Sequence, residues 1–591
     1  MCGICGELRF DQTSPDLTAL ARMMAAMERR GPDHGGSYSE GPLAFGHRRL
    51  SIIDLSEASD QPLHDPDLGL VLVFNGTIYN YPELREELIC LGYHFFSHGD
   101  TEVILKAYHA WGADSVARLN GMFAFALWDL HRHELFLARD RTGIKPLYLA
   151  RDNQRLRFAS NTQALLAGGG VDTALDPAAL HHHFSLHTVV PAPDTILCGV
   201  KKLPPAHWMR IARDGATTCE RYWMLEARRP TEAVPEEEWV ARVKQQLFAA
   251  VERQHRVADV PVGVLLSGGL DSSLLVGILA QLGASLDTFT IGFEDDAREA
   301  GNEFFYSDII ARHFGTRHRR HLMTNAQVLA RIPEAVANMA EPMVSQDVTS
   351  FYLLGEQVAK EMKAVLSGQG ADEVFGGYFW YPLMDAEAGS PLERFRKHYF
   401  DRPHDEFAQM LEPTFLSDDV TSALVAQELS KPGADSFLDQ VLRFDSTTLI
   451  VDDPVKRVDN MTMAWGLEAR VPFLDHKLIE TAMQVPPALR LAQGGKGILK
   501  TIARQLIPAE VIDRPKGYFP MPALKFLSGP FLDWVREILM SDACRHRGLY
   551  RHTYVERLLA EPDRHFTPIK GSKLWHLALL EFWLQTHVDG R

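Results

Sequence analysis

The stretch that most constrains the fold of this chain is VPVGVLLSGGLDSSLLVGILAQLG, residues 260–283. An apolar run of strand length comes first, a glycine- and serine-rich loop follows, and an apolar run of helix length comes last. LDTFTIGF and the start of MKAVLSGQGADEVFGGY, residues 286–293 and 362–378, predict two further strands. Strands that alternate with helices favour an α/β domain with a parallel sheet, whose ligands bind at the carboxyl ends of the strands.

The loop SGGLDSS between that strand and helix predicts a phosphate site. Glycines let the backbone approach a polyphosphate, and the N-terminus of the helix supplies unpaired N–H donors. The G-x-x-x-x-G-K-[ST] loop of the common nucleoside triphosphatases is absent from the sequence, and Asp271 and serines stand here without a lysine. A plain turn with a helix cap is the alternative, but strand, loop and helix occur in the order that a phosphate site needs.

A second acidic group follows the third predicted strand, where Asp372 stands beside Glu373. Mg²⁺ prefers oxygen ligands and usually takes one or two carboxylates together with substrate phosphates. Asp271 and Asp372 are therefore candidate Mg²⁺ ligands against a pyrophosphate group. One aspartate after a glycine is more often a turn former, but two at strand ends of one parallel sheet are harder to explain that way.

Residues 1–223 carry a different pattern. Short β-rich runs at 41–54, 68–81, 120–129 and 133–150 alternate with helical patterns near 16–30, 82–91 and 101–111. They predict an α+β domain of stacked sheets. A polar stretch with proline and glutamate predicts a linker at 224–237, so that the α/β domain spans 238–591. Two domains also fit the length of 591 residues, which exceeds what one core usually supports.

Cys2 directly follows the initiator methionine. Removal of Met1 would leave a thiol and a free α-amino group on one residue, which places a nucleophile beside a weak base. A small second residue that merely permits methionine removal is the commoner explanation for an isolated Cys2. Cys5 completes a C-x-x-C pair, but no partner motif follows at zinc-finger spacing, so a structural zinc site is not expected.

The composition excludes several classes of protein. Sixty-one Lys and Arg against 77 Asp and Glu give a net charge of −16, which disfavours nucleic acid as the main partner. Six scattered cysteines are typical of a reducing compartment. No stretch of about 18 uncharged apolar residues suggests a membrane span. The sequence therefore predicts a soluble, cytoplasmic protein, and it leaves open whether the chain is a monomer or a homodimer.

Ten stretches carry a resemblance to a known family. They occur in the family's order across nearly the whole chain: MCGICG, RRGPD, RRLSIID, NGTIYN, GDTEV, RDRTGIKPLYL, SGGLDSS, GADEVFGGY, LEARVPFLD and RPKGYFP. The chain resembles the glutamine-hydrolysing asparagine synthetases, or class II glutamine amidotransferases. The resemblance implies an α+β N-terminal-nucleophile (Ntn) glutaminase sandwich followed by an α/β parallel-sheet pyrophosphate-loop synthetase of the adenine nucleotide α-hydrolase type.

In the glutaminase half, the resemblance implies an amino-acid pocket. Cys2 would attack the side-chain amide of glutamine, and its own α-amino group would move the proton. Asn75 and the backbone N–H of Gly76 would form the oxyanion hole. Arg49 would bind the α-carboxylate of glutamine, and Asp100 would bind its α-ammonium group.

In the synthetase half, the resemblance implies that ATP adenylylates a carboxylate with Mg²⁺ as the cofactor, and that ammonia then displaces AMP. Lys496 would neutralise charge on the activated intermediate. The residues that would bind pyrophosphate are Ser267, Gly268, Gly269, Asp271 and Ser272, and those that would line the AMP portion are Leu266, Ile291, Ser367 and Gly368. Ammonia released at Cys2 would need a protected path to the second site, because it would protonate in water.

Two positions depart from the family pattern. Thr77 stands where relatives commonly carry a Glu that helps to hold the glutamine amine, which leaves Asp100 to hold it largely alone. Gln369 replaces a Glu that faces the acceptor in relatives that make asparagine. A neutral Gln can only exchange hydrogen bonds, which puts free aspartate in doubt as the acceptor.

The sequence thus predicts an ATP-dependent, glutamine-hydrolysing amidotransferase that converts a carboxylate to an amide. These departures and the chain length resemble most the family branch that amidates N-acetylglutaminylglutamine, a blocked dipeptide. Asparagine synthetase itself is the main alternative. A non-catalytic binding protein is disfavoured by the intact Cys2, Asp271 and Asp372, and a tRNA-modifying enzyme by the negative charge.

Overall fold

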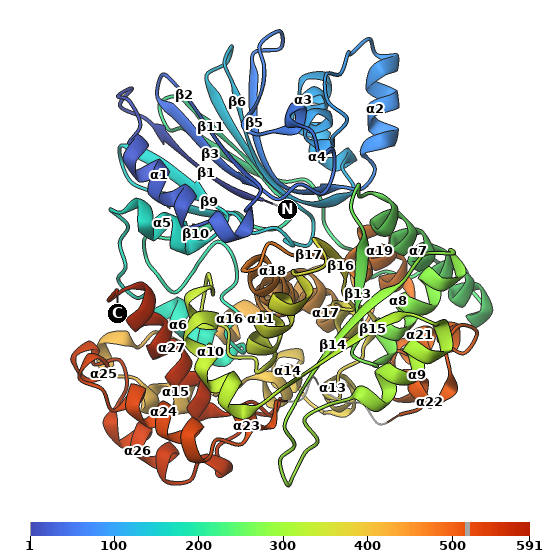
Figure 1. Ribbon diagram of the computed structural model, residues 1–591. Helices are drawn as coiled ribbons and strands as arrows, with labels where there is room; N and C mark the ends of the chain where they lie inside the picture. Colours follow the sequence, from blue (N-terminus) through green and yellow to red (C-terminus); the bar gives the residue numbers. More distant parts are fainter. Residues whose placement is uncertain (1, 515–520, 591) are drawn as a thin grey trace.

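The computed structural model describes residues 2–514 and 521–590, so RPKGYFP lies outside the described residues except for Arg514. Figure 1 shows a sandwich of two β-sheets above a larger lobe in which helices surround a third sheet. The N-terminus lies at the boundary between the two parts. The expected combination of an α+β sandwich with an α/β parallel-sheet domain is confirmed.

The sandwich consists of two six-stranded antiparallel sheets, with strand orders β10-β8-β9-β1-β3-β2 and β12-β11-β7-β6-β5-β4. Apolar side chains of alternate residues, among them Ile4, Phe45 and Val73, fill the space between the sheets. Its strands are β1 (Gly3–Arg9), β2 (His34–Glu40), β3 (Leu43–Arg49), β4 (Leu63–Asp65), β5 (Leu70–Ile78), β6 (Gly121–Asp129), β7 (Glu134–Arg139), β8 (Tyr148–Arg151), β9 (Arg155–Ala159), β10 (Lys201–Lys202), β11 (His207–Ala212) and β12 (Thr217–Arg221).

Helices cover the outer faces of both sheets. α1 packs on the first sheet, and α3 packs on the second with α2 beside it. The helices of this part are α1 (Leu17–Ala25), α2 (Tyr81–Cys90), α3 (Asp100–Trp111), α4 (Ser115–Arg118), α5 (Thr162–Gly168) and α6 (Pro177–Ser185). The first three agree with the helical patterns in the sequence.

The third sheet is parallel throughout, with strand order β15-β14-β13-β16-β17. Its strands are β13 (Val262–Leu265), β14 (Asp287–Phe293), β15 (Arg317–Met323), β16 (Ala364–Leu366) and β17 (Glu468–Arg470). The three predicted strands are β13, β14 and β16, which form the centre of the sheet. The two edge strands, β15 and β17, were not predicted from the sequence.

Helices α7 to α27 complete the second part. Those nearest the sheet are α7 (Glu236–Arg256), α8 (Leu270–Gln281), α9 (Phe304–Phe314), α10 (Asn325–Ala337), α11 (Asp347–Val358), α12 (Ala371–Phe375), α18 (Lys456–Met463), α19 (His476–Gln484) and α21 (Gly497–Ala503). The remainder include α13 (Trp380–Ala386), α14 (Pro391–Tyr399), α15 (His404–Met410), α16 (Val420–Ser430), α17 (Phe437–Phe444), α24 (Gly529–Leu539), α26 (His552–Ala560) and α27 (Lys573–His587). Two π-helical turns, η5 (Asp445–Leu449) and η6 (Val451–Val455), lead into α18.

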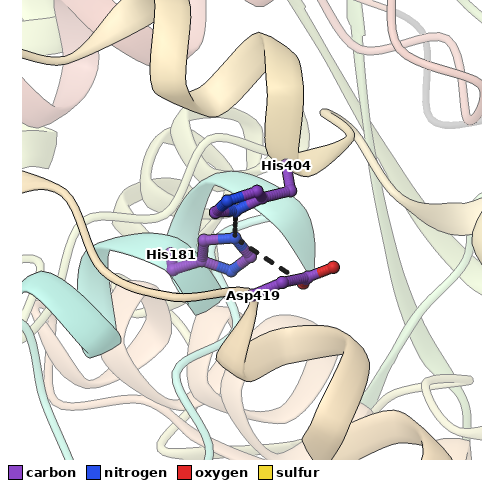
Figure 2. A group of neighbouring side chains, drawn as sticks. All are labelled: His181, His404 and Asp419. Carbon is purple, nitrogen blue, oxygen red and sulfur yellow. Dashed lines mark hydrogen bonds and ion pairs between the residues drawn. The ribbon is translucent and has the colours of Figure 1, made fainter.

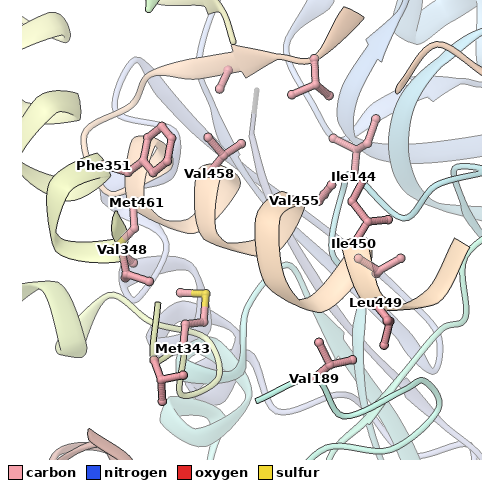
Figure 3. Packing of buried hydrophobic residues seen from close by; sticks show 14 of the residues in the cluster. Ile144, Val189, Met343, Val348, Phe351, Leu449, Ile450, Val455, Val458 and Met461 are labelled. Atoms are coloured by element: carbon pink, nitrogen blue, oxygen red, sulfur yellow. The ribbon is translucent and has the colours of Figure 1, made fainter. Parts of the chain in front are cut away.

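A buried apolar layer joins the two parts (Figure 3). Ile144 and Val189 come from the N-terminal part, and they lie near the π-helical turns and α18 of the second part. Val348 and Phe351 of α11 extend the same layer. The two parts therefore share one continuous core. Among the described residues, no helix has the length and apolar character that crossing a bilayer requires.

Candidate active sites

The first site lies where the sandwich meets the second part, around Cys2. Cys2 immediately precedes β1, and its backbone N–H donates to Oδ1 of Asn75 on β5 at 3.0 Å. The other polar atom of that amide, Nδ2, is buried without a hydrogen-bond partner among the described residues. An unpaired buried donor beside a nucleophile is the arrangement that an oxyanion hole requires.

The neighbouring Gly76 is required by close packing of the backbone. A Cβ at this position would lie 2.1 Å from the carbonyl oxygen of Met122 on the adjacent β6. No larger residue fits without moving one of the two strands. Glycine therefore keeps the β5 backbone beside Cys2 in place.

Arg49 and Asp100 reach the same pocket from different elements. Arg49 ends β3, and its Nη1 donates to Oδ1 of Asp60 at 2.6 Å and to the carbonyl of Ser56 at 2.9 Å. Asp100 begins α3, and its Oδ2 accepts from the N–H of Ile78 at 2.9 Å. These contacts fix a cation and a carboxylate around one small pocket.

Burial shifts the pKa values of Cys2 and Asp100 in this pocket. It raises the pKa of the Cys2 thiol above its ordinary value, so the resting thiol is protonated and needs a base. Burial, together with the charge of Glu468, raises the pKa of Asp100 to about 6. At neutral pH Asp100 is therefore ionised, but at a cost that a bound ammonium group would relieve.

The structure brings all the predicted glutamine-site residues together. The pocket is lined by Cys2, Arg49, Leu50, Ile52, Ile53, Ser59, Gln61, Phe74, Gly76, Thr77, Asp100, Thr101 and Glu468, and Asn75 lies behind Cys2. Glu468, which comes from β17 of the other domain, was missed by the sequence reasoning. The sequence around Glu468, LEARVPFLD, does not indicate that this residue lines the glutamine pocket. The one hint in the sequence is that Thr77 lacks the carboxylate that the family pattern has there.

The second site is built on the turn between β13 and α8. Gly268 has a φ of +77°, and a Cβ there would lie 2.5 Å from the backbone nitrogen of Ser307. Ser267 Oγ accepts from the N–H of Gly269 at 3.2 Å and lies 3.1 Å from Oγ of Ser272. The tight turn leaves the first N–H groups of α8 directed at the end of the sheet, as an anion site requires.

Lys496 links the two acidic residues of this site. Its Nζ lies 2.6 Å from Oδ2 of Asp271 at the start of α8 and 2.8 Å from Oδ2 of Asp372 at the start of α12. Burial favours the neutral amine, but the two carboxylates prevail and raise the pKa of Lys496 above its ordinary value. Two carboxylates within reach of one Nζ are close enough to share a cation, so their chemistry fits Mg²⁺.

The predicted nucleotide residues lie around one pocket at the carboxyl ends of β13, β14 and β16. Of these residues, the lining includes Leu266, Ser267, Asp271, Ser272, Ile291, Ser367, Gly368, Gln369 and Asp372. Gly268 and Gly269 shape the turn beside the lining, and Lys496 reaches in from the residue before α21. The sequence reasoning missed Tyr378, which also lines the pocket and whose hydroxyl donates to Oε1 of Glu373 at 2.6 Å.

A larger chamber of about 1160 Å³, open mouth included, adjoins the nucleotide pocket and shares Glu373 and Tyr378 with it. Its walls carry the aromatic residues Tyr378, Phe379, Trp380, Tyr399 and Trp575. Burial and the neighbouring Asp372 raise the pKa of Glu373 to about 7. A group activated at the nucleotide pocket would have room in this chamber for the rest of its molecule.

A separate histidine group lies outside both sites (Figure 2). Nε2 of His181 lies 3.0 Å from Nδ1 of His404 and 3.7 Å from Oδ1 of Asp419. Nδ1 of His181 also lies 2.6 Å from Oγ1 of Thr421. Both ring nitrogens of His181 therefore have hydrogen-bond partners, and this group ties α6 to α15 and α16 without needing an ion.

Comparisons with known proteins agree with this architecture. A glutamine amidotransferase domain model matches residues 1–223, and an asparagine synthase model matches residues 242–585. The chain is similar to asparagine synthetase [glutamine-hydrolyzing] 1 of Bacillus subtilis, with 30% identity over 100% of this chain and 98% of that protein. It is also similar to a putative asparagine synthetase [glutamine-hydrolyzing] of Mycobacterium tuberculosis, with 33% identity over 97% of this chain and 94% of that protein.

A solved structure of a glutamine phosphoribosylpyrophosphate amidotransferase from Bacillus subtilis matches 54% of this chain and 65% of its own. The identity is 16% and the TM-score is 0.29. A likeness this low carries no argument about the chain. The family assignment depends on the two domain models and the full-length relatives.

Proposed function

The chain belongs to the asparagine synthase family and is a glutamine-hydrolysing, ATP-dependent amidotransferase of that family, and from this premise we propose how its residues divide the work. Residues 1–223 form the glutaminase domain, 224–237 the linker and 238–591 the synthetase domain. Ammonia from glutamine converts an adenylylated carboxylate to an amide, with release of AMP and pyrophosphate. Free cysteines throughout the chain fit a cytoplasmic site of action.

In the glutaminase domain, Cys2 attacks the amide carbon of glutamine after removal of Met1. The thiol needs a base because burial raises its pKa, and the α-amino group of Cys2 is the base nearest to it by covalent geometry. The unpaired Nδ2 of Asn75 and the N–H of Gly76 donate to the oxyanion. Arg49 binds the α-carboxylate of glutamine and Asp100 its α-ammonium group.

In the synthetase domain, the loop of Ser267, Gly268, Gly269 and Ser272 binds the pyrophosphate part of ATP. Asp271 and Asp372 would hold Mg²⁺, which would supply positive charge to neutralise the phosphates. Lys496 contacts both carboxylates, and in this proposal its positive charge neutralises the activated intermediate. Leu266, Ile291, Ser367 and Gly368 line the AMP portion.

The acceptor is a blocked peptide carboxylate, and N-acetylglutaminylglutamine is the substrate that we propose. The observation that carries this proposal is the chamber beside the nucleotide pocket, where Oε1 of Gln346 and Nε1 of Trp380 are buried without a hydrogen-bond partner among the described residues. Such neutral groups suit the amides of a peptide. Gln369, which lines the nucleotide pocket, is a third neutral group on the acceptor side.

Three charged groups of the chamber are balanced by one another. Arg457 pairs with Asp347 at 3.2 Å and with Asp453 at 2.7 Å. Burial and the neighbouring Glu373 raise the pKa of Asp445 well above its ordinary value, which disfavours its charged form. Free aspartate would bring an ammonium group and a second carboxylate, each of which would need a partner of opposite charge.

Aspartate remains the alternative, because the relatives named above are asparagine synthetases. An ATP–pyrophosphate exchange assay separates the two acceptors. The panel contains aspartate, N-acetylglutaminylglutamine and unblocked glutaminylglutamine, which differs from the proposed substrate in its free ammonium group. We expect exchange and amide formation with the blocked dipeptide above all, whereas asparagine formation without turnover of the dipeptide would contradict the proposal.

A further inference from the structure

Glu468 enters the glutamine pocket from the opposite domain. It begins β17, the edge strand of the synthetase sheet, yet it lines the pocket together with Cys2, Arg49 and Asp100 of the glutaminase domain. Its side chain is completely buried. A buried carboxylate in a substrate pocket demands a charged or hydrogen-bonding partner.

Thr77 marks the place where this carboxylate lies. Oγ1 of Thr77 is 3.3 Å from Oε1 and 3.4 Å from Oε2 of Glu468. The family resemblance of NGTIYN implies a Glu at the position of Thr77. In this chain a carboxylate from β17 lies within hydrogen-bond distance of that position.

Glu468 keeps its negative charge in this environment. Although burial opposes ionisation, nearby positive charges, that of Arg470 first among them, lower the pKa of Glu468 to about 2. Nε of Arg470 donates to Oε1 of Glu468 at 2.5 Å. Glu468 and Asp100 thus present two carboxylates to one pocket, and each makes a nearby cation more favourable.

We propose that Glu468 binds the α-ammonium group of glutamine together with Asp100, and that it completes the glutamine site only when the two domains are docked. This assignment rests on the proposed glutaminase function and adds to it a substrate-binding residue from the synthetase domain. Arg49 contacts one end of the amino-acid backbone of glutamine, and the two carboxylates contact the other.

The sheet explains how this residue is held. β17 pairs in parallel with β16, so that Glu468 lies opposite Ala364 and Arg470 lies opposite Leu366. The N–H of Ser367, which lines the nucleotide pocket, donates to the carbonyl of Arg470 at 2.8 Å. One pair of strands therefore carries residues of both active sites.

The test compares glutamine with glutaramate, which has the same side-chain amide and carboxylate but no α-amino group. We expect Glu468→Gln to raise the KM for glutamine about 10-fold or more, with a much smaller change in kcat. The kinetic constants for glutaramate should stay unchanged, because this substrate has no ammonium group to lose. Glu468→Asp, which keeps the charge and shortens the side chain, should raise the KM for glutamine less.

A further test asks whether a carboxylate at position 77 can substitute for the carboxylate of Glu468. In the Glu468→Gln background, Thr77→Glu should lower the KM for glutamine again, whereas the neutral control Thr77→Gln should not. Equal damage to glutamine and glutaramate turnover would mean that Glu468 is only structural, and an unchanged KM for glutamine would also overturn the proposal. If the wild-type protein hydrolyses no glutamine at all, it is the proposed function that fails.

If Glu468→Gln does not fold, the KM values of Glu468→Asp for glutamine and for glutaramate are compared instead. Thermal unfolding of each variant, measured without substrate, identifies that case. A selective rise in the KM for glutamine supports the assignment, and equal effects on the two substrates contradict it. The ammonium group of the substrate, rather than overall activity, is therefore what each experiment measures.

Discussion

At the scale of single residues, Cys2 is the residue whose replacement should separate glutamine hydrolysis from amide synthesis. Cys2→Ala should lower glutamine-dependent synthesis by about a thousandfold or more, because the nucleophile is lost. Synthesis from added ammonia should persist, since the nucleotide and acceptor pockets belong to other elements. Amide product formed from each nitrogen source measures both effects. A folded variant that ammonia fails to rescue would show that Cys2 is not confined to glutamine hydrolysis.

The raised pKa of Asp100 leads us to expect that kcat/KM for glutamine depends on pH in a characteristic way. Its pKa of about 6 means that the carboxylate gains a proton as the pH falls through 6, and it then no longer attracts the ammonium group of glutamine. The α-amino base already gives an acid limb near its reference pKa of roughly 7.7 to 8.0. The logarithm of kcat/KM for glutamine should therefore fall with slope one at first and with slope two below about pH 6.

The matched control for this pH profile is Asp100→Asn. This variant lacks the second titrating group, so its acid limb should keep slope one, although its kcat/KM is lower throughout. Glutaminase rates from pH 5 to pH 8 give both profiles. Identical shapes in the two proteins would assign the low-pH loss to another group.

At the scale of secondary-structure elements, we expect the turn between β13 and α8 to determine whether ATP binds. Gly268→Ala places a Cβ 2.5 Å from the nitrogen of Ser307, at a φ of +77° that disfavours a side chain. We expect ATP binding and AMP formation to be lost, while glutaminase activity is kept. Gly283→Ala is the control, because Gly283 has a φ of +74° just beyond the same helix but no atom within 4 Å of the added Cβ.

Gly283→Ala should therefore lower stability by about 1 kcal/mol without weakening ATP binding. Nucleotide titration and thermal unfolding separate the two quantities. Equal loss of ATP binding in both glycine variants would mean that backbone strain alone explains the effect, without a contact at the phosphate site.

The starts of α8 and α12 carry the two carboxylates that meet at Lys496. Asp271→Asn and Asp372→Asn should each reduce AMP formation with either nitrogen source by about 100-fold or more, because the proposed magnesium-pyrophosphate group would lose a charged ligand. Asp513→Asn, in an exposed pair with Arg504, is the control and should leave the rate unchanged. AMP release measured with ammonia isolates this step, and near-normal release from either site variant would contradict the assignment.

The strands of the synthetase sheet differ in whether the sequence pattern predicts them. β13, β14 and β16 are apolar and central, so their pattern is visible along the chain. β15 reads RHRRHLM because an edge strand faces solvent, and β17 is only three residues long with a buried Glu and Arg. Local patterns report burial on a strand's own faces, and they carry no information about charges that are neutralised across a domain boundary.

The candidate sites divide in the same way. The motifs identified residues that come together within one domain, such as Ser267 with Ser272 or Asn75 with Cys2. Glu468 could not be assigned, because its partner Thr77 lies 391 positions away on another sheet. Lys496 was assigned through the resemblance, and its bridge between Asp271 and Asp372 emerges only when three helix starts converge.

At the scale of the whole molecule, the boundary between the domains combines apolar packing with buried charge. Asp459 of α18 accepts from Nη1 of Arg30 at 3.0 Å and from Nζ of Lys145 at 2.9 Å. All three side chains are almost fully buried, and both cations belong to the glutaminase domain. Arg30 also lies 3.4 Å from the carbonyl of Cys2. The docking of the domains is therefore tied to the position of the nucleophile.

Asp459→Asn should consequently affect transfer of ammonia more than either half-reaction. The substitution leaves two buried cations without their carboxylate, which costs about 3 to 5 kcal/mol when one partner of a buried pair is removed. We expect looser docking and water entry along the interface, where ammonia would be protonated. The exposed pair of Arg118 and Glu87 provides the control, Glu87→Gln, which should have little effect.

Isotope dilution measures this leakage directly. With amide-labelled heavy-nitrogen glutamine and an excess of unlabelled ammonium, the wild-type protein should place the label in the product, because we expect ammonia to travel inside the docked molecule. Asp459→Asn should dilute the label and form more glutamate than amide, while glutaminase and ammonia-dependent rates each persist. Undiluted label in Asp459→Asn would show that the buried ion triad does not seal the path, and would leave the apolar layer of Ile144, Val348 and Met461 as the barrier to water.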